Sequence, residues 1–251
     1  MLEPPSPLAL VAGIGMVVVG LVAALGWWRR TKVAPAYFWL GVVAWVVHVA
    51  LRLAAGKADA PLAAWLHAHA PSSARLLADL YLGVLRGLFV TVSLWFFAKR
   101  SRVGTATEPE AVAYGIGFGA VEAVLLGVYS VFGIVLALTS WNEMTPASRL
   151  QASQLTGAAH LALPAFERAV ILVLSVAEAV LVAGAVRHAR RAWLAIAFVA
   201  ATTTAALTAW AADHFGMRTD AGYVKTELVV AATVAFWAIV TAGLVRRARR
   251  P

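Results

Sequence analysis

Residues 111–127 read AVAYGIGFGAVEAVLLG and lie within an apolar run, 111–138, whose one charged residue is Glu122. A helix that crosses the hydrocarbon core of a bilayer, roughly 30 Å thick, needs about 20 such residues. Runs of similar length recur along the chain, and in lipid each backbone polar group must be bonded within its own segment. We therefore expect about seven transmembrane helices. The expected spans are 8–28, 36–54, 75–98, 111–138, 164–186, 192–212 and 223–245.

The composition is that of a membrane protein. The chain has 251 residues, of which 62% are hydrophobic and 13% are charged, whereas a soluble domain has about 25% charged residues. The lipid bilayer must therefore solvate much of the surface. Because the gaps between the runs are mostly short, we expect a single all-α, polytopic membrane helix bundle over residues 1–251. The chain has no cysteines, which excludes disulfides and thiolate metal sites.

Positive charges are unevenly divided between alternate connections. One set of connections carries 13 of the 21 Lys and Arg residues, and the opposite set carries 5. By the positive-inside rule, the N-terminus faces out and the C-terminus is cytoplasmic, as in a multi-pass protein of a prokaryotic-type inner cell membrane. The net charge of +9 thus reflects topology and does not indicate a nucleic-acid partner. The larger set is Arg29, Arg30, Lys32, Lys99, Arg100, Arg102, Arg187, Arg190, Arg191, Arg246, Arg247, Arg249 and Arg250.

Two connections on the less basic side are long enough for structure of their own. Residues 55–74 contain a short apolar segment that predicts a surface helix, and Thr145-Pro146 predicts the start of another within 139–163. Three histidines are expected on this side: His67, His69 and His160. A shared metal site is one interpretation of them, but we expect separate, solvated side chains.

Ionisable residues inside the spans are costly and are functional-site candidates. Asp79, Arg86, Glu122, the Glu167-Arg168 pair and Glu178 all lie within expected spans. A rise of about 1.5 Å per residue places Arg86 and Glu122 both on the order of 16 Å deep, near the midplane. We expect an ion pair between these two, since it would remove the cost of two lone charges. A structural role for this pair is favoured over a proton-handling or catalytic one.

The fifth expected span carries a line of polar residues. Glu167 and Glu178 are about three helical turns apart and share one face, on which Ser175 also lies. This predicts a polar seam directed at the bundle interior. The hydroxyls of 202–204 in the sixth span either contribute to this seam or bond to their own backbone.

Small residues form a ridge beside the carboxylate of the fourth span. Gly115 and Gly119, followed by Ala123 and Gly127, recur every four residues, so a neighbouring helix is expected to approach closely there. The glycines resemble a dinucleotide-binding loop only superficially, because no strand precedes them.

These residues also resemble a known family. The stretch YGIGFGAVEAVLLG at 114–127 is similar to the signature of the YhfC-type intramembrane metalloproteases, which are distant relatives of the CAAX-processing and bacteriocin-processing membrane proteases. Glu122 matches the family glutamate. The stretch FERAVILVLSVAEAVLV at 166–182 resembles a second family segment, in which Glu167 and Arg168 match. The resemblance implies a site of membrane-embedded glutamates and histidines that activates water for peptide cleavage.

The chain departs from this family pattern at the metal-binding positions. Phe118 and Ser175 stand where the family has histidines, and Arg86-Gly87 replaces a pair of glutamates in YLGVLRGLFV, 81–90. Val90 replaces an arginine. Neutral imidazoles bind catalytic metal ions, whereas a fixed cation repels them, so we expect no metal and no other cofactor.

The resulting prediction is a protease-like membrane protein, impaired in catalysis, that binds a membrane-embedded peptide or protein. The candidate catalytic residues are Glu122, Glu167 and Arg168, and Arg86, Ser175 and Glu178 form a candidate polar network. One alternative is an active glutamic-type intramembrane protease, which requires a water-filled cavity. A second alternative is a small proton-coupled transporter in which Glu178 carries the proton.

Overall fold

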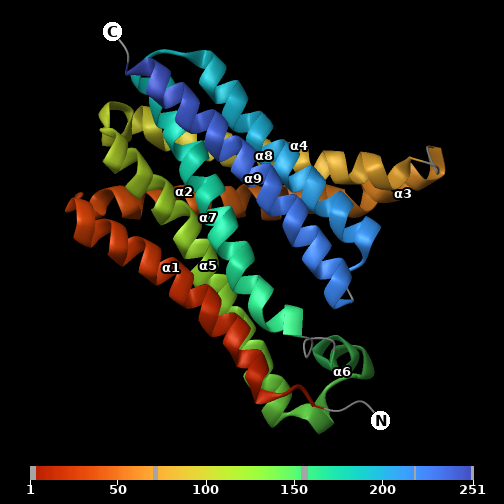
Figure 1. Cartoon of the computed structure of the whole chain (residues 1–251). Helices are drawn as coiled ribbons and strands as arrows, with labels where there is room; N and C mark the ends of the chain where they lie inside the picture. Colours follow the sequence, from red (N-terminus) through yellow and green to blue (C-terminus); the bar gives the residue numbers. More distant parts are fainter. Residues whose placement is uncertain (1–3, 70–72, 154–157, 218, 250–251) are drawn as a thin grey trace.

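Long apolar helices make up most of the molecule, which is seen here in a computed structural model (Figure 1). The structure describes residues 4–69, 73–153, 158–217 and 219–249, and the elements in these ranges are all helical. Seven helices are long and apolar enough to cross a membrane, which confirms the predicted all-α bundle. They are α1 (Leu10–Thr31), α2 (Pro35–Ala55), α4 (Ala74–Arg100), α5 (Glu108–Thr139), α7 (Ala158–Arg187), α8 (Arg191–Phe215) and α9 (Asp220–Ala248).

The two predicted surface helices are also present. They are α3 (Asp59–His69) and α6 (Pro146–Ser153). Short 3-10 turns complete the secondary structure: η1 (Pro7–Ala9), η2 (Gly56–Ala58), η3 (Arg102–Thr105) and η4 (Trp141–Glu143).

The helices extend beyond the predicted spans. The largest difference is at α7, which begins at Ala158 although the apolar run predicts a start at 164. Pro164 lies inside this helix and does not end it. Hydropathy locates the lipid-facing part of a helix, whereas the hydrogen-bonded helix continues into its polar flanks. One consequence is that His160 belongs to the same helix as Glu167 and Arg168.

Sequence signals fix the start of α5. Thr107 is the N-cap, and Glu110 accepts a hydrogen bond from the Thr107 backbone N–H at 2.7 Å in a capping box. Pro109 occupies the first turn, where its missing N–H has no cost. The helix that carries Glu122 therefore begins at a defined residue.

The α5 helix is the centre of the bundle. Residues 113–120 are buried on every side, and α5 packs against α1, α2 and α7. A Cβ added to Gly115 would lie 2.6 Å from the Cα of Val176 in α7, and one added to Gly117 would lie 2.8 Å from the Cα of Phe38 in α2. The small-residue ridge thus lets helix backbones meet, as predicted. The Tyr114 hydroxyl donates to the Leu94 carbonyl of α4 at 3.0 Å.

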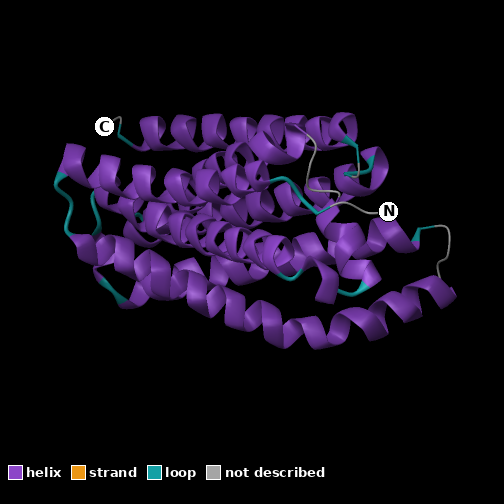
Figure 2. Ribbon diagram, turned by 90° about the horizontal axis from the view of Figure 1, so that it is seen from below, coloured by secondary structure: helices purple, strands orange, loops and turns teal. Residues whose placement is uncertain are grey.

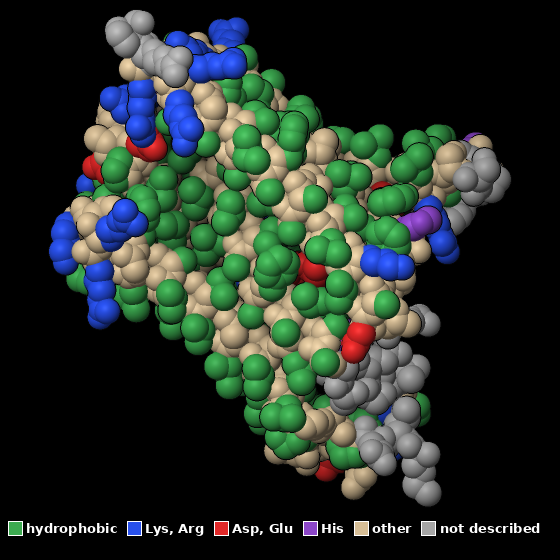
Figure 3. Space-filling view, in the orientation of Figure 1, with side chains coloured by type: hydrophobic (Ala, Val, Ile, Leu, Met, Phe, Trp, Pro, Cys, Tyr) green, Lys and Arg blue, Asp and Glu red, His purple; other side chains and the backbone are tan. Residues whose placement is uncertain are grey.

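The helices run between two chemically different ends. We call the end that contains the last turn of α9 the basic end, because the described members of the larger set of Lys and Arg residues belong to it. Figure 3 shows such side chains gathered beside the C-terminus. The opposite end, which contains α3 and α6, is here called the loop end. Figure 1 shows α1 running beside α5 along the bundle, while α3 and α6 lie apart at the loop end. Figure 2, seen from below, shows the long helices running side by side.

Candidate functional site

A three-residue ion-pair cluster joins α5 to α7 inside the bundle. Arg168 Nη1 donates to Glu122 Oε1 at 2.9 Å, and Arg168 Nη2 donates to Glu167. The Arg168 side chain is 11% exposed and that of Glu122 is 16% exposed. One guanidinium group therefore donates hydrogen bonds to two carboxylates. The site is largely buried, and charge-assisted hydrogen bonds are strong there. The structure brings together all three residues that the sequence predicts as catalytic candidates.

Close packing of α5 on α7 positions this cluster. A Cβ added to Gly119 would lie 3.1 Å from the Cβ of Ser175 and 3.2 Å from the Cα of Leu172. Glu122 follows Gly119 by about one turn, and Arg168 precedes Leu172 by about one turn, so the two side chains meet across the helix crossing. The glycine ridge is thus what allows the ion pair to form.

The predicted partner of Glu122 was wrong. Within the described residues, Arg86 forms no ion pair with Glu122, and Arg168 holds this carboxylate instead. Both arginines lie at a suitable depth, but α7 packs more extensively on α5 than α4 does. Arg86 still lies close enough for its charge to act on Glu122. It is a second cation of the site and not the primary partner.

His48 of α2 belongs to the same surroundings, although it is not among the residues predicted from sequence. Its charge when protonated would act on Glu122, and its ring centroid lies 5.8 Å from that of Phe118. His48 Nδ1 is buried and lacks a hydrogen-bond partner in the described part of the chain. The signal was available, since a histidine lies inside the second expected span.

Glu178 lies deeper along the predicted polar seam of α7. It is 3% exposed, and its Oε1 atom has no hydrogen-bond partner among the described residues. The charges of Arg86 and Glu122 act on it. Ser175 contributes little to the seam, because its hydroxyl donates to the Ile171 carbonyl of its own helix at 3.1 Å.

Toward the loop end, α9 adds polar residues that the sequence analysis did not single out. Glu227 is 3% exposed, and the charges of Glu167 and Arg168 act on it. One helical turn earlier, Tyr223 packs on His160 of α7, with ring centroids 5.0 Å apart. The Nδ1 atom of His160 lies 3.3 Å from Oδ1 of Asp220. These residues extend the polar seam to α9 near the loop end, whereas farther along α7 and α9 meet through apolar side chains such as Leu174 and Val230.

The side chains of this region do not fit a divalent metal ion. No group of three or more His, Asp or Glu side chains in the described ranges is close enough to hold one. Phe118 is an apolar, buried ring, and the Ser175 hydroxyl is bonded to its own helix. The Arg168 cation already occupies the carboxylates of Glu122 and Glu167. A shared histidine site at the loop end also lacks support in the described residues, and the His67 side chain lies outside them.

An apolar groove opens between α1, α2 and α5. Its volume is about 550 Å³, and small residues, Gly20, Ala24 and Ala120, lie among its lining. Trp28 and Trp39 also line it. Glu122 does not belong to this lining, so the groove follows α5 beside the ion-pair cluster and does not lead into it.

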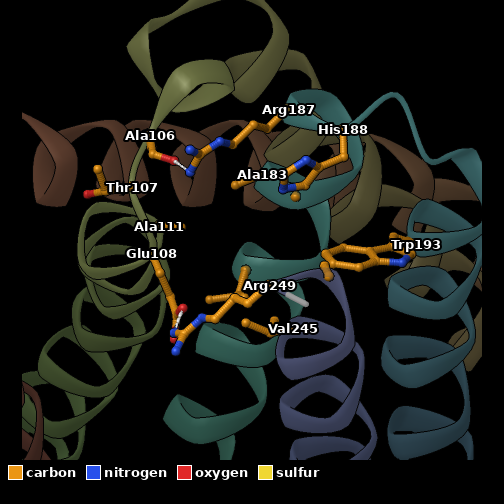
Figure 4. A pocket seen from close by; sticks show the side chains of 13 residues that line it. Ala106, Thr107, Glu108, Ala111, Ala183, Arg187, His188, Trp193, Val245 and Arg249 are labelled. Carbon is orange, nitrogen blue, oxygen red and sulfur yellow. Dashed lines mark hydrogen bonds and ion pairs between the residues drawn. The ribbon is translucent and has the colours of Figure 1, made fainter. Parts of the chain in front are cut away.

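A second cavity lies at the basic end, where the ends of α5, α7, α8 and α9 meet (Figure 4). Its volume is about 350 Å³. Arg249 is ion-paired with Glu108 across one side, and Arg187 donates to the Ala106 carbonyl at 3.1 Å. These contacts tie the helix ends together at the surface. The cavity lies far along the bundle from the loop-end residues of the seam and contains none of the predicted site residues.

Comparisons with known proteins give one family. The profile of the YhfC intramembrane metalloprotease family matches residues 15–233. This range contains the ion-pair cluster, both segments of the sequence resemblance and nearly all of the seven long helices. No curated protein and no solved structure shows a significant match to the chain.

Proposed function

Since the chain belongs to the YhfC intramembrane metalloprotease family, we propose that it is a member that works without a metal ion and binds a transmembrane helix of another protein. The observation that carries this proposal is that a buried phenylalanine ring, Phe118, and a hydroxyl bonded to its own helix, Ser175, stand where the family pattern has histidines. Arg168 also holds Glu122 at 2.9 Å and is bonded to Glu167. A protease that activates water on a metal needs an open coordination position. Here the carboxylates that match the family pattern are engaged by a cation that belongs to the chain.

The partner class follows from the family description and from the groove. An intramembrane protease acts on polypeptides inside the bilayer, so the ancestral surface of this fold accommodates a membrane-embedded segment. Exposed apolar side chains such as Leu21 and Leu25 line the groove, and the small Ala24 leaves room beside them for a neighbouring helix. The groove is also suitably apolar for a segment that arrives from lipid. We assign it to a single transmembrane helix.

The proposal includes an orientation. The basic end faces the cytoplasm, and the loop end faces out, because the positive-inside rule places Lys- and Arg-rich connections on the cytoplasmic side of a cell membrane. Cysteine-accessibility labelling of Ser101→Cys and Ser148→Cys in intact cells tests this. An impermeant maleimide is expected to label the second variant only.

The first experiment measures metal content. Purified protein in lipid nanodiscs is incubated with Zn²⁺, washed and analysed by mass spectrometry for zinc per chain. We expect well under one zinc per chain. The matched comparison is the Phe118→His, Ser175→His double variant, which restores the imidazoles of the family pattern and is expected to raise the zinc content. A wild-type chain that keeps one zinc would contradict the metal-free assignment.

The second experiment measures partner binding and cleavage together. A photoreactive phenylalanine replaces Leu21, which lines the groove, or Ile239 of α9, which is 73% exposed and serves as the control. A tagged single-span reporter is co-reconstituted in vesicles. We expect it to cross-link at position 21 and not at 239, and to remain intact. Cleavage that persists with chelator and is lost in Glu122→Gln would instead support the glutamic-type protease.

A further inference from the structure

Two carboxyl groups are buried in the membrane-spanning helices, and the proposed function gives them no role. Glu178 and Glu227 are each 3% exposed, and each has a carboxyl oxygen that is fully buried without a hydrogen-bond partner in the described part of the chain. Neither forms an ion pair there, unlike Glu122 and Glu167. An isolated, ionised carboxylate in such a place is strongly unfavourable, and the group is accommodated by neutralisation.

The charges around these two groups can be enumerated. Apart from Asp220, which is half exposed at the loop end, the carboxyl groups of the seam and the ion-pair cluster are Glu122, Glu167, Glu178 and Glu227. The two guanidinium groups are those of Arg168 and Arg86, and His48 of α2 also faces Glu122. Arg86 of α4 and Glu122 of α5 face Glu178, whereas Glu167 and Arg168 of α7 face Glu227. If all four carboxyl groups were ionised, the cluster would carry an excess of two negative charges inside the membrane.

We propose that Glu178 and Glu227 are two proton-binding groups on either side of the ion-pair cluster, a two-proton site in which each carboxyl group carries a proton at neutral pH. Glu122 and Glu167 then remain ionised and are balanced by Arg168 and Arg86. This assignment removes the excess charge, and it places the protons on the two carboxyl groups that lack ion-pair partners. The ligand of this site is the proton itself.

The seam provides the access route for these protons. Glu227 lies seven residues after the start of α9 at Asp220, which is about 10 Å along the helix. Between it and the loop end lie Tyr223 and the His160–Asp220 pair, of which the Asp220 side chain is 50% exposed. Glu178 is farther from this end, beyond Arg168 and Glu122. We therefore assign Glu227 as the outer and Glu178 as the inner proton-binding group.

Infrared spectroscopy of the full chain in nanodiscs at pH 7 tests the assignment. A protonated carboxyl group has a C=O stretching band at higher frequency than either carboxylate band, and this band shifts in D₂O. Glu178→Gln and Glu227→Gln are each expected to remove one component of the band. Glu143→Gln, which changes an exposed glutamate of η4, is the matched control and is expected to leave the band unchanged.

The order of exchange tests the access route. On transfer to D₂O, the component lost in Glu227→Gln is expected to shift before the component lost in Glu178→Gln. A wild-type spectrum without the protonated band, or one unaffected by both substitutions, would overturn the two-proton site. The reverse order of exchange would overturn the route from the loop end. Neither outcome depends on metal content or on partner binding.

Discussion

The two halves of the bundle differ in how they are held together. Toward the basic end, helices meet through a core of mostly apolar side chains that includes Leu94, Tyr114, Phe118 and Val182, with Glu178 buried beside the Gly115 crossing. Toward the loop end, α7 meets α5 and α9 through charged groups, among them the Arg168–Glu122 pair. Backbones approach closely in both halves, at Gly115 in the first and in the second at Gly127, where a Cβ would lie 2.6 Å from the Gly13 carbonyl oxygen. The second half depends on whether each buried charge has a partner.

This difference separates structural from chemical roles. Within α5, the buried residues 113–120 supply contact area and leave no polar group free to react, whereas Glu122, which lies next along the helix, is bonded to a cation. An enzyme needs both a packed surface that holds the helices together and polar groups that are free to react. In this chain the packed surface is preserved, and we propose that the chemical surface has become a closed ion-pair cluster.

The largest loss of stability is expected from a substitution in the polar half. Arg168→Leu removes the hydrogen-bonded partner of Glu122 and Glu167 and leaves two carboxylates in a largely buried place. Breaking a buried pair in this way costs about 3–5 kcal/mol. The measurement is unfolding in mixed detergent micelles. A loss of stability as small as that from replacing an exposed arginine would show that the cluster is hydrated and does not stabilise the fold.

The next effect is on the packed half. Gly115→Val adds a side chain where even a Cβ would lie 2.6 Å from the Val176 Cα, so α5 and α7 must separate. Overpacking of this kind costs about 1–3 kcal/mol. Gly243→Val is the matched control, since a Cβ there meets nothing within 4 Å. Equal losses from both variants would contradict the role of the glycine ridge.

A smaller effect is expected for Glu178→Gln. If this carboxyl group is neutral, an amide of the same shape replaces it without loss of a charge interaction, and the free energy of unfolding changes by less than about 1 kcal/mol. Glu122→Gln, measured in parallel, is expected to cost more because it removes a charged partner of Arg168. Equal costs in the two variants would show that Glu178 is ionised.

The smallest effect is expected at the surface of the basic end. The side chains of Arg249 and Glu108 are 63% and 41% exposed, so water and salt screen their attraction. Arg249→Gln is expected to change stability by about 0–1 kcal/mol, and less at high salt. A loss comparable to that of Arg168→Leu would mean that the two halves do not differ as described.

The fold was predictable from sequence because lipid imposes a strong constraint. Apolar length predicts each of the seven long helices, and the four-residue spacing of Gly115 and Gly119 predicts the close approach of a neighbour. The helix ends were less predictable, as at Ala158, because polar flanks continue the helix without an apolar signal.

The site was predictable only in part. Depth identifies Glu122, Glu167 and Arg168 as intramembrane charges, but depth does not tell which helix lies beside which. Depth therefore predicts Arg86 as the partner of Glu122, whereas the structure has Arg168 of α7 in that role. Glu227 lies near the start of α9, where depth alone does not distinguish a hydrated glutamate from one that α7 covers. Lateral packing decides both cases.

The most direct test of the central claim is a pair of double-mutant cycles on Glu122. Glu122→Gln is combined with Arg168→Leu in one cycle and with Arg86→Leu in the other, and unfolding is measured in mixed micelles. We expect a coupling energy of about 2–3 kcal/mol for Arg168 and under about 1 kcal/mol for Arg86. Additive effects in the Arg168 cycle would contradict the account, because Glu122 would then be open to water or to a metal ion.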